Sequence, residues 1–219
     1  MQLIDIIKEE IQKWYHGTPD SREIKKSGFT PRTDTTQYVE YPEKWNEMQV
    51  QMDAARKQGN EDLYFDLLDE RGEMLKTLTY KKPIYFAKDS SVARTYADPW
   101  KSFDYQSAEP SVFTVDIDDS GKKLTINAQG ESFRGISTDV VKKALMEDGI
   151  DETVIDHMFG MFMNWIRNGK MTAETLAIIA QQLNYDIVDV INVVDTYTGK
   201  GSRSTVRMIF DPQRIKINN

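Results

Sequence analysis

Cysteine is absent from the 219-residue chain, and histidine occurs only twice, at His16 and His157. Without cysteine the protein has no disulfide bonds, no thiolate nucleophile and no cysteine ligand for zinc. Two isolated histidines with no carboxylate cluster beside them are not typical of a zinc site. His157 lies among methionines in a helical stretch, which favours a core or helix-face role. We therefore expect no bound metal, and other groups must carry any chemistry.

Positive charge is also scarce, because 28 Lys and Arg stand against 35 Asp and Glu, a net charge of −7 at pH 7. A stable nucleic-acid interface normally needs a basic stripe, so this balance leaves at most a local basic patch for a briefly held nucleic acid. No apolar run approaches the ~20 residues of a membrane span, and the N-terminus lacks a signal-peptide pattern. There is no P-loop and no GxGxxG motif. We expect a soluble, cytoplasmic protein with no membrane partner.

Strand and helix patterns alternate along the chain without repeats, low-complexity segments or linkers, which predicts one α+β domain over residues 1–219. Alternating or short apolar runs bounded by turn residues predict the strands of a sheet core. These strand stretches are residues 13–16, 83–87, 112–117, 124–126, 187–191, 206–210 and 214–217. Helical insertions interrupt this core at about residues 41–79 and 130–184.

Apolar spacing predicts a helix over residues 3–11. Capping residues at 20–21 predict a second helix over residues 22–26, which ends at Ser27-Gly28, and a further helix is expected over residues 172–183. Residues 151–167 are apolar on nearly every face, which predicts a single buried helix ended by Asn168-Gly169. The charged stretch 41–79 indicates a helical hairpin, either a solvated surface feature or a lid over a site. Its expected inner face consists of Trp45, Met48, Leu63, Phe65, Leu67, Leu68 and Leu75.

One candidate site stands out, where His16 is followed at once by Gly17 at the end of a short aromatic strand. A histidine there can bind ribose hydroxyls, and a glycine lets a ligand approach the backbone, although both residues could be purely structural. Tyr85 ends a second strand and Tyr96 follows in the next helix, so two rings can face each other across a gap. Each tyrosine alone is typical of a core; together with His16 they predict a clamp for a planar heterocycle.

These stretches resemble a known family. Tyr15-His16-Gly17-Thr18, the helix ending at Gly28, and Ile84-Tyr85-Phe86-Ala87 with Tyr96 eleven residues beyond Tyr85 are similar to ADP-ribosyltransferases of the diphtheria-toxin and poly(ADP-ribose) polymerase branch. That branch carries a His–Tyr–Glu triad. Ala93 looks more like the toxin pattern, since the polymerases commonly have serine there. The C-terminal stretch from residue 185 to 216 is similar to phage and bacterial relatives. The resemblance implies a split mixed or antiparallel sheet.

The resemblance also implies roles for the site residues. NAD would be the co-substrate, with His16 on the adenosine-side ribose, the Gly17 backbone on the nicotinamide carboxamide, and Tyr85 and Tyr96 on either side of the nicotinamide ring. His16 and Tyr85 would also be two of the three triad members. The residues implied to contact NAD are His16, Gly17, Thr18, Tyr85, Phe86, Ala93 and Tyr96.

The chain departs from the family at the third triad position. Counting back along the last long strand places Val206 or Thr205 where the family has glutamate, and neither is acidic. Three explanations compete: transfer of a single ADP-ribose without the glutamate, replacement by another carboxylate such as Glu131 or Asp189, or NAD binding without catalysis. Each argues against polymer elongation.

The sequence-based expectation is an NAD-dependent mono-ADP-ribosyltransferase that modifies an unknown protein or nucleic acid. The resemblance suggests a phage or bacterial effector, toxin or anti-defence factor that acts in a host cytosol. One alternative is a catalytically silent NAD- or ADP-ribose-binding module that works through its insertions. Another is an enzyme like the RNA 2′-phosphotransferases, which needs arginines around phosphates. The plausible set for that chemistry is Arg32, Arg94, Arg203 and Arg207.

Overall fold

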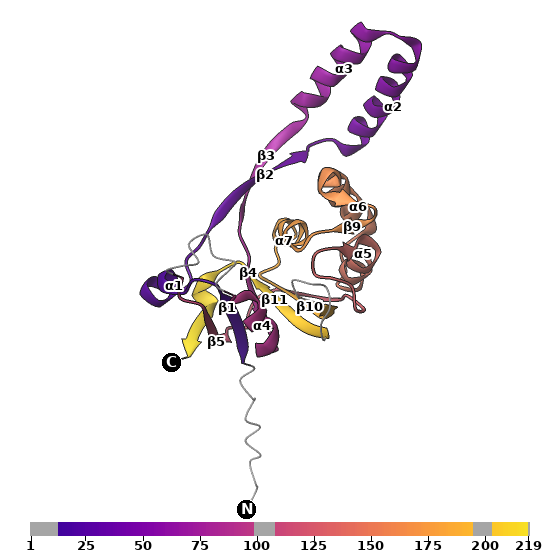
Figure 1. Cartoon of the computed structure of the whole chain (residues 1–219). Coiled ribbons are helices and arrows are strands. Elements are labelled where there is room, and N and C mark those ends of the chain that lie inside the picture. Colours follow the sequence, from indigo (N-terminus) through magenta and orange to yellow (C-terminus); the bar gives the residue numbers. More distant parts are fainter. Residues whose placement is uncertain (1–12, 99–107, 195–202, 219) are drawn as a thin grey trace, which may run out of the picture.

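The computed structural model describes residues 13–98, 108–194 and 203–218, and it is a mixed α+β structure (Figure 1). The helix predicted for residues 3–11 lies outside the described residues. A seven-stranded sheet has the order β12-β5-β1-β4-β11-β10-β6. Its neighbours pair antiparallel except β6 and β10, which pair parallel. The mixed sheet expected from the sequence is therefore confirmed.

The strands of this sheet agree closely with the predicted stretches. They are β1 (Trp14–Thr18), β4 (Ile84–Ala87), β5 (Ser111–Ile117), β6 (Lys123–Asn127), β10 (Ile187–Val194), β11 (Arg203–Ile209) and β12 (Ile215–Asn218).

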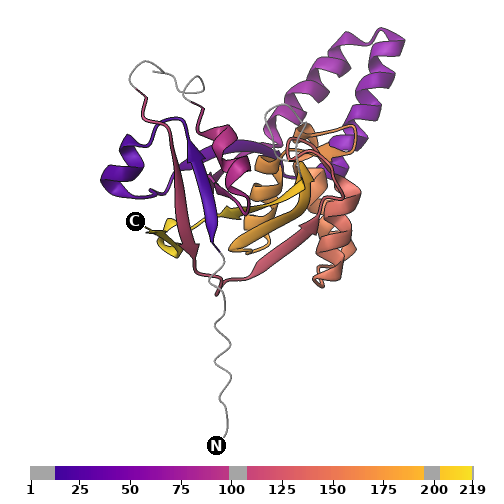
Figure 2. The same ribbon diagram turned by 60° about the horizontal axis from the view of Figure 1, so that its bottom comes forward.

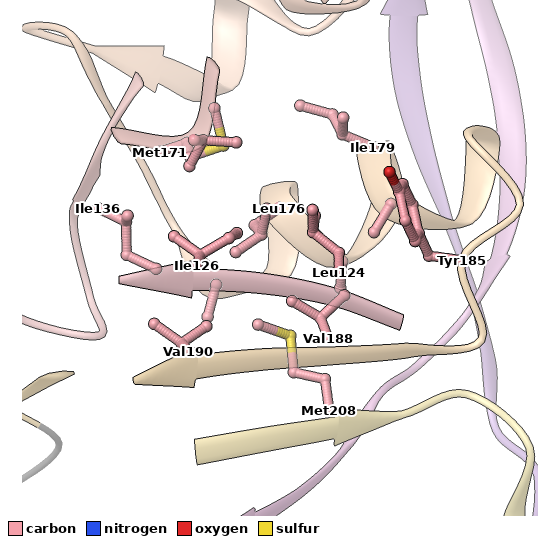
Figure 3. Close-up of a cluster of buried hydrophobic side chains, with 14 of the residues drawn as sticks. Leu124, Ile126, Ile136, Met171, Leu176, Ile179, Tyr185, Val188, Val190 and Met208 are labelled. Carbon is pink, nitrogen blue, oxygen red and sulfur yellow. The ribbon is translucent and has the colours of Figure 1, made fainter. Parts of the chain in front are cut away.

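The main core lies between the β6-β10-β11 part of the sheet and three helices. Residues Val188 and Val190 of β10 and Met208 of β11 point to the helix side, where they meet Leu176 of α7 (Figure 3). Neighbouring residues on the same strands, such as Ile187 and Ile209, pack on the opposite face with Trp14 and Phe86. This period of two explains why most residues of β10 are apolar, since both faces of the strand are covered. The helices are α5 (Thr138–Glu147), α6 (Glu152–Met161) and α7 (Ala173–Gln182).

The predicted helical hairpin is present, and it projects from the body on a two-stranded ribbon (Figure 1). Its elements are β2 (Thr33–Val39), α2 (Pro42–Gln58), α3 (Glu61–Glu73) and β3 (Leu75–Lys81). Trp45, Met48 and Leu67 form a small core of its own. Two expectations were wrong: residues 75–78 belong to β3 because they pair with β2, and Leu63, Phe65 and Leu68 are exposed.

The helix predicted over residues 151–167 is shorter than expected. It ends at Met161, and after a 3₁₀ turn (η2, Met163–Trp165) the chain forms β8 (Ile166–Arg167). Asn168 and Gly169 both have positive φ, 52° and 66°, and join β8 to β9 (Lys170–Met171) as a two-residue turn. Asn-Gly is therefore a hairpin turn here, because type I′ turns need positive φ at both central residues. Strand β7 (Ile136–Ser137) completes this small sheet.

Two short helices flank the β1 side of the large sheet. They are α1 (Arg22–Ser27) and α4 (Ser90–Tyr96), and the Asp89 carboxylate caps α4 by accepting from the Ser91 N–H at 2.7 Å. A second view shows the hairpin extending away from β1 and β5 (Figure 2). Among the described helices, none has the length and apolar character needed to cross a membrane.

Candidate functional site

The site begins where β1 and β4 separate. Their ladder contains one pair, Tyr15 with Ala87, whereas β1 stays paired with β5 through Thr18. The Lys88 N–H donates to the Thr205 carbonyl at 2.9 Å, so alternate residues of β4 direct their backbone groups to β11. Tyr85 and Ala87 consequently face β1, and Tyr15 and Gly17 face β4. The N–H and C=O of Gly17 thus point into the gap beyond the last β1–β4 pair.

His16 bridges this gap with its side chain. Its Nδ1 lies 2.9 Å from the Tyr85 carbonyl oxygen, and because a carbonyl only accepts, Nδ1 is the protonated nitrogen. The Nε2 atom of the neutral ring is then an acceptor. Burial lowers the pKa of His16 below its usual 6.5, and the Tyr85 hydrogen bond offsets part of that shift. Phe29 lies edge-on to the imidazole, with 4.9 Å between ring centres. A neutral, rigidly held acceptor suits a ligand hydroxyl.

Gly17 has a second reason to lack a side chain. A Cβ atom at this position would lie 1.7 Å from the Ala93 carbonyl oxygen of α4. Helix α4 therefore rests directly on β1, and the buried Ala93 makes part of that contact. The sequence-based interpretation of Gly17 as a point of ligand approach is incomplete, because helix packing alone already excludes any larger residue.

A cavity of about 320 Å³ fills the gap between β1 and β4. Its volume falls in the range typical of small-molecule sites. Tyr85 and Tyr96 both line it, and the Phe133 ring stands at 89° to the Tyr85 ring with 5.6 Å between centres. Of the residues predicted from the sequence, it brings together His16, Gly17, Tyr85, Phe86, Ala93, Tyr96 and Val206.

A second cavity of about 410 Å³ adjoins the first, since His16 and Tyr85 line both. Thr18, predicted to contact the nucleotide, lines this second space instead, and its hydroxyl donates to the Asp20 carbonyl at 2.7 Å. Hydrogen bonds from Arg22 lower the pKa of Asp20 to about 2. Arg32 and Lys82 add positive charge to its wall. An extended molecule can therefore reach across the His16–Tyr85 boundary.

The third triad position brings no carboxylate to the cavity. Val206 is buried and lines it, whereas Thr205 lines a separate open hollow with Lys88 and Arg203. No acidic side chain lies among the described residues that line the main cavity.

Both candidate replacements for the glutamate are engaged elsewhere. Asp189 is buried and holds Arg207 through two oxygens, each at 2.7 Å. Glu131 accepts from the Ser137 N–H at 2.6 Å and lies 3.8 Å from Lys170 Nζ. Neither residue lines the cavity, so neither stands in for the missing glutamate in this arrangement.

The arginine set expected of a phosphotransferase is not assembled. Arg207 is buried against Asp189 and Trp14, Arg32 lines the second cavity, and Arg203 lines the open hollow. His157 lies on the exposed side of α6, 3.6 Å from Glu43. The described ranges hold no group of three metal-ligating side chains.

Four lining residues were missed at the sequence level: Tyr15, Ala87, Phe133 and Arg134. Phe133 and Arg134 come from the loop between β6 and β7, inside the expected insertion. The only signal for them is the flanking pair Gly130 and Gly135, which marks a loop but not its position in space.

Comparisons with protein-family models, curated proteins and solved structures find no match to this chain. The case for a function therefore rests on the geometry. The cavity offers two aromatic faces, a hydroxyl-binding nitrogen, a backbone edge able to pair with an amide, and one guanidinium, that of Arg134. These groups suit a nucleotide that carries a planar carboxamide ring.

Proposed function

We propose that the protein binds NAD in the gap between β1 and β4 and is a mono-ADP-ribosyltransferase with an ADP-ribosyltransferase-like fold in a single domain. The observation that carries the proposal is the cavity itself. It combines His16, the backbone edge of Gly17, Tyr85 and Tyr96 in one space of nucleoside size.

The two adjoining cavities suggest how the dinucleotide lies. The nicotinamide ring occupies the main cavity between Tyr85 and Tyr96, and its carboxamide pairs with the N–H and C=O of Gly17. The adenosine half extends past His16 into the second cavity, where His16 Nε2 accepts from a ribose hydroxyl. Arg134 and Arg32 supply positive charge for the diphosphate.

The proposed reaction breaks the bond between the nicotinamide nitrogen and ribose C1′, and the electron pair leaves with nicotinamide. A nucleophile on the acceptor bonds to C1′ and releases its proton to water. Binding of the departing ring by the tyrosines and Gly17 is the contribution of this chain. Because Val206 replaces a carboxylate, no residue is available to activate a ribose hydroxyl for chain growth. The product is therefore a single ADP-ribose on a macromolecule, and action in a host cytosol as a phage or bacterial effector is part of the proposal.

The missing carboxylate also favours a second candidate, a module that binds NAD or ADP-ribose without catalysis. An oxocarbenium-like centre gains most from a nearby negative charge, and no acidic residue lines the cavity in the described part of the chain. In that case the protein would act on its partners through the helical insertions.

One experiment separates the candidates. The protein is incubated with NAD labelled in the adenylate phosphate and with cell lysate, and label is followed on protein and on nucleic acid. His16→Ala and Tyr85→Ala test the site, and Tyr41→Ala on the exposed hairpin serves as the control.

Label that is lost in both site variants but kept in Tyr41→Ala supports the transferase. Saturable NAD binding without label supports the silent module. Absence of NAD binding by the wild-type protein contradicts both.

A further inference from the structure

A second surface, which we call the basic groove, opens beside the cavity with a volume of about 650 Å³. It runs between β2 and the β8–β9 turn. The residues that matter here are Gln37, Arg134, Asn164, Trp165, Arg167 and Lys170. Arg134 lines both the groove and the main cavity, so the two spaces meet at this side chain.

Charge in the basic groove is of one sign. Arg134, Arg167 and Lys170 contribute three cations, and no acidic residue in the described part of the chain lines the groove, although the whole chain carries a net charge of −7. Within the described residues Arg167 forms no ion pair, and the nearest pairing of Lys170, with Glu131, spans 3.8 Å. A local concentration of cations on an acidic protein indicates an anionic partner at this place.

Trp165 gives the groove a flat aromatic face. Its side chain is 51% exposed, although the sequence predicted burial. The indole Nε1 donates to the Gln37 carbonyl at 3.0 Å, which fixes the ring against β2 while leaving it half open to solvent. An exposed, immobilised ring beside cations is the arrangement on which nucleic-acid bases stack.

We propose that the basic groove binds single-stranded nucleic acid, with a base on Trp165 and phosphates on Arg167 and Lys170. The amides of Gln37 and Asn164 provide hydrogen bonds for base edges. A paired duplex keeps its bases stacked inside, so it cannot use the indole face. An acidic peptide could pair with the cations, but it has no planar base to stack on the Trp165 ring.

The groove also suggests the acceptor for the proposed transferase, and this part rests on the proposed function. A strand lying over Trp165 continues toward Arg134, where the main cavity opens. A nucleophilic atom of that strand would bond to ribose C1′ as nicotinamide leaves, and its proton would pass to water.

The test measures binding first, without NAD. Fluorescein-labelled oligo(dT) and oligo(U) of equal length are titrated with the full-length protein, and anisotropy gives the dissociation constant. Trp165→Ala and Arg167→Glu should each weaken binding by about tenfold or more. Trp165→Phe keeps a ring and should retain most of the affinity. Lys143→Glu, an equal charge change on the exposed side of α5, should stay close to wild type.

Salt dependence supplies a second readout. Removing Arg167 should reduce the slope of log K against log salt by about 0.7, the value expected per phosphate contact on a single strand. Comparison of oligo(dT) with oligo(U) distinguishes DNA from RNA.

The groove proposal is overturned by absence of oligonucleotide binding, by equal losses in Lys143→Glu and Arg167→Glu, or by tighter binding of an acidic peptide such as oligo-glutamate. Calorimetric NAD titration of the wild-type protein keeps the two proposals separate. A wild-type protein that binds NAD but no oligonucleotide contradicts the groove alone, and one that binds oligonucleotide but no NAD contradicts the NAD site alone.

Discussion

Because Gly17 lies so close to the Ala93 carbonyl, adding one methyl group at position 17 tests the packing of α4 on β1. In Gly17→Ala the new Cβ would approach the Ala93 carbonyl oxygen to 1.7 Å, so α4 must shift away from β1. We expect a loss of about 1–3 kcal/mol in the free energy of unfolding, typical of overpacking, together with weaker NAD binding. Urea denaturation measures the first effect.

Gly72 in α3 is the matched control. Nothing lies within 4 Å of a Cβ atom there, so Gly72→Ala should stabilise the protein by up to about 1 kcal/mol, since alanine favours a helix. Equal changes in the free energy of unfolding for Gly17→Ala and Gly72→Ala would contradict the close contact between α4 and Gly17.

The protonation of His16 predicts a pH dependence with a definite sign. Burial lowers the pKa of His16 from 6.5 in the folded protein. At mildly acidic pH the imidazole is therefore protonated more fully in the unfolded chain than in the folded one. Wild type should therefore lose stability relative to His16→Gln as pH falls from 7.5 toward 5.5, by up to about 1.4 kcal/mol per pH unit. Urea midpoints at several pH values measure this difference. If wild type instead gains stability relative to His16→Gln as pH falls, folding favours the protonated ring and the prediction is contradicted.

Residues within local motifs were predictable, and residues brought by distant loops were not. His16 and Gly17 lie on β1 and Tyr85 lies on β4, and these two strands are neighbours in the sheet. Short stretches of sequence were therefore enough to predict that these residues line one cavity. Phe133 and Arg134 reach the same space through a loop whose path depends on packing between β6 and β7. The contribution of that loop follows from tertiary structure alone.

At the level of elements, the Asp189–Arg207 pair holds β10 and β11 together beneath Trp14. Both side chains are buried, and the guanidinium stacks on the indole at 4.2 Å. Asp189→Leu leaves the buried Arg207 guanidinium with Asp119, which is about half exposed, as its remaining carboxylate partner, so we expect a loss of about 3–5 kcal/mol in the free energy of unfolding.

The double variant Asp189→Leu/Arg207→Met removes both charges and should recover most of that stability. A denaturant double-mutant cycle measures the coupling. Additive losses would show that the two side chains do not act as a pair.

The two errors in helix bounds share one cause. Residues 75–78 and 166–167 have side chains compatible with helices, and only pairing with a partner strand makes them extended. Asn168-Gly169 ends a helix as readily as it turns a hairpin, so the dipeptide alone cannot distinguish the two. Apolar content likewise misled the expectation for Trp165, whose ring is held by the Gln37 carbonyl at the surface.

For the whole molecule, the question is whether the helical hairpin serves the site. No residue of α2 or α3 lines either cavity, and the hairpin extends away from β1 (Figures 1 and 2). The lid interpretation therefore has no support in this arrangement.

Deletion of the hairpin tests this point. Glu40 and Met74 continue the β2–β3 ladder with a 3.0 Å backbone hydrogen bond, so residues 41–73 can be replaced by Asn-Gly. NAD affinity should change by less than about twofold, or ~0.4 kcal/mol. Loss of binding in a variant that still melts cooperatively would restore the lid interpretation.

The central claim is that NAD occupies the gap between β1 and β4, and calorimetric titration with NAD tests it most directly. We predict one NAD per wild-type chain, binding weakened by about tenfold or more in Tyr85→Ala, and unchanged affinity in Tyr41→Ala. No heat of binding in the wild type, or equal affinity in wild type and Tyr85→Ala, would contradict the claim.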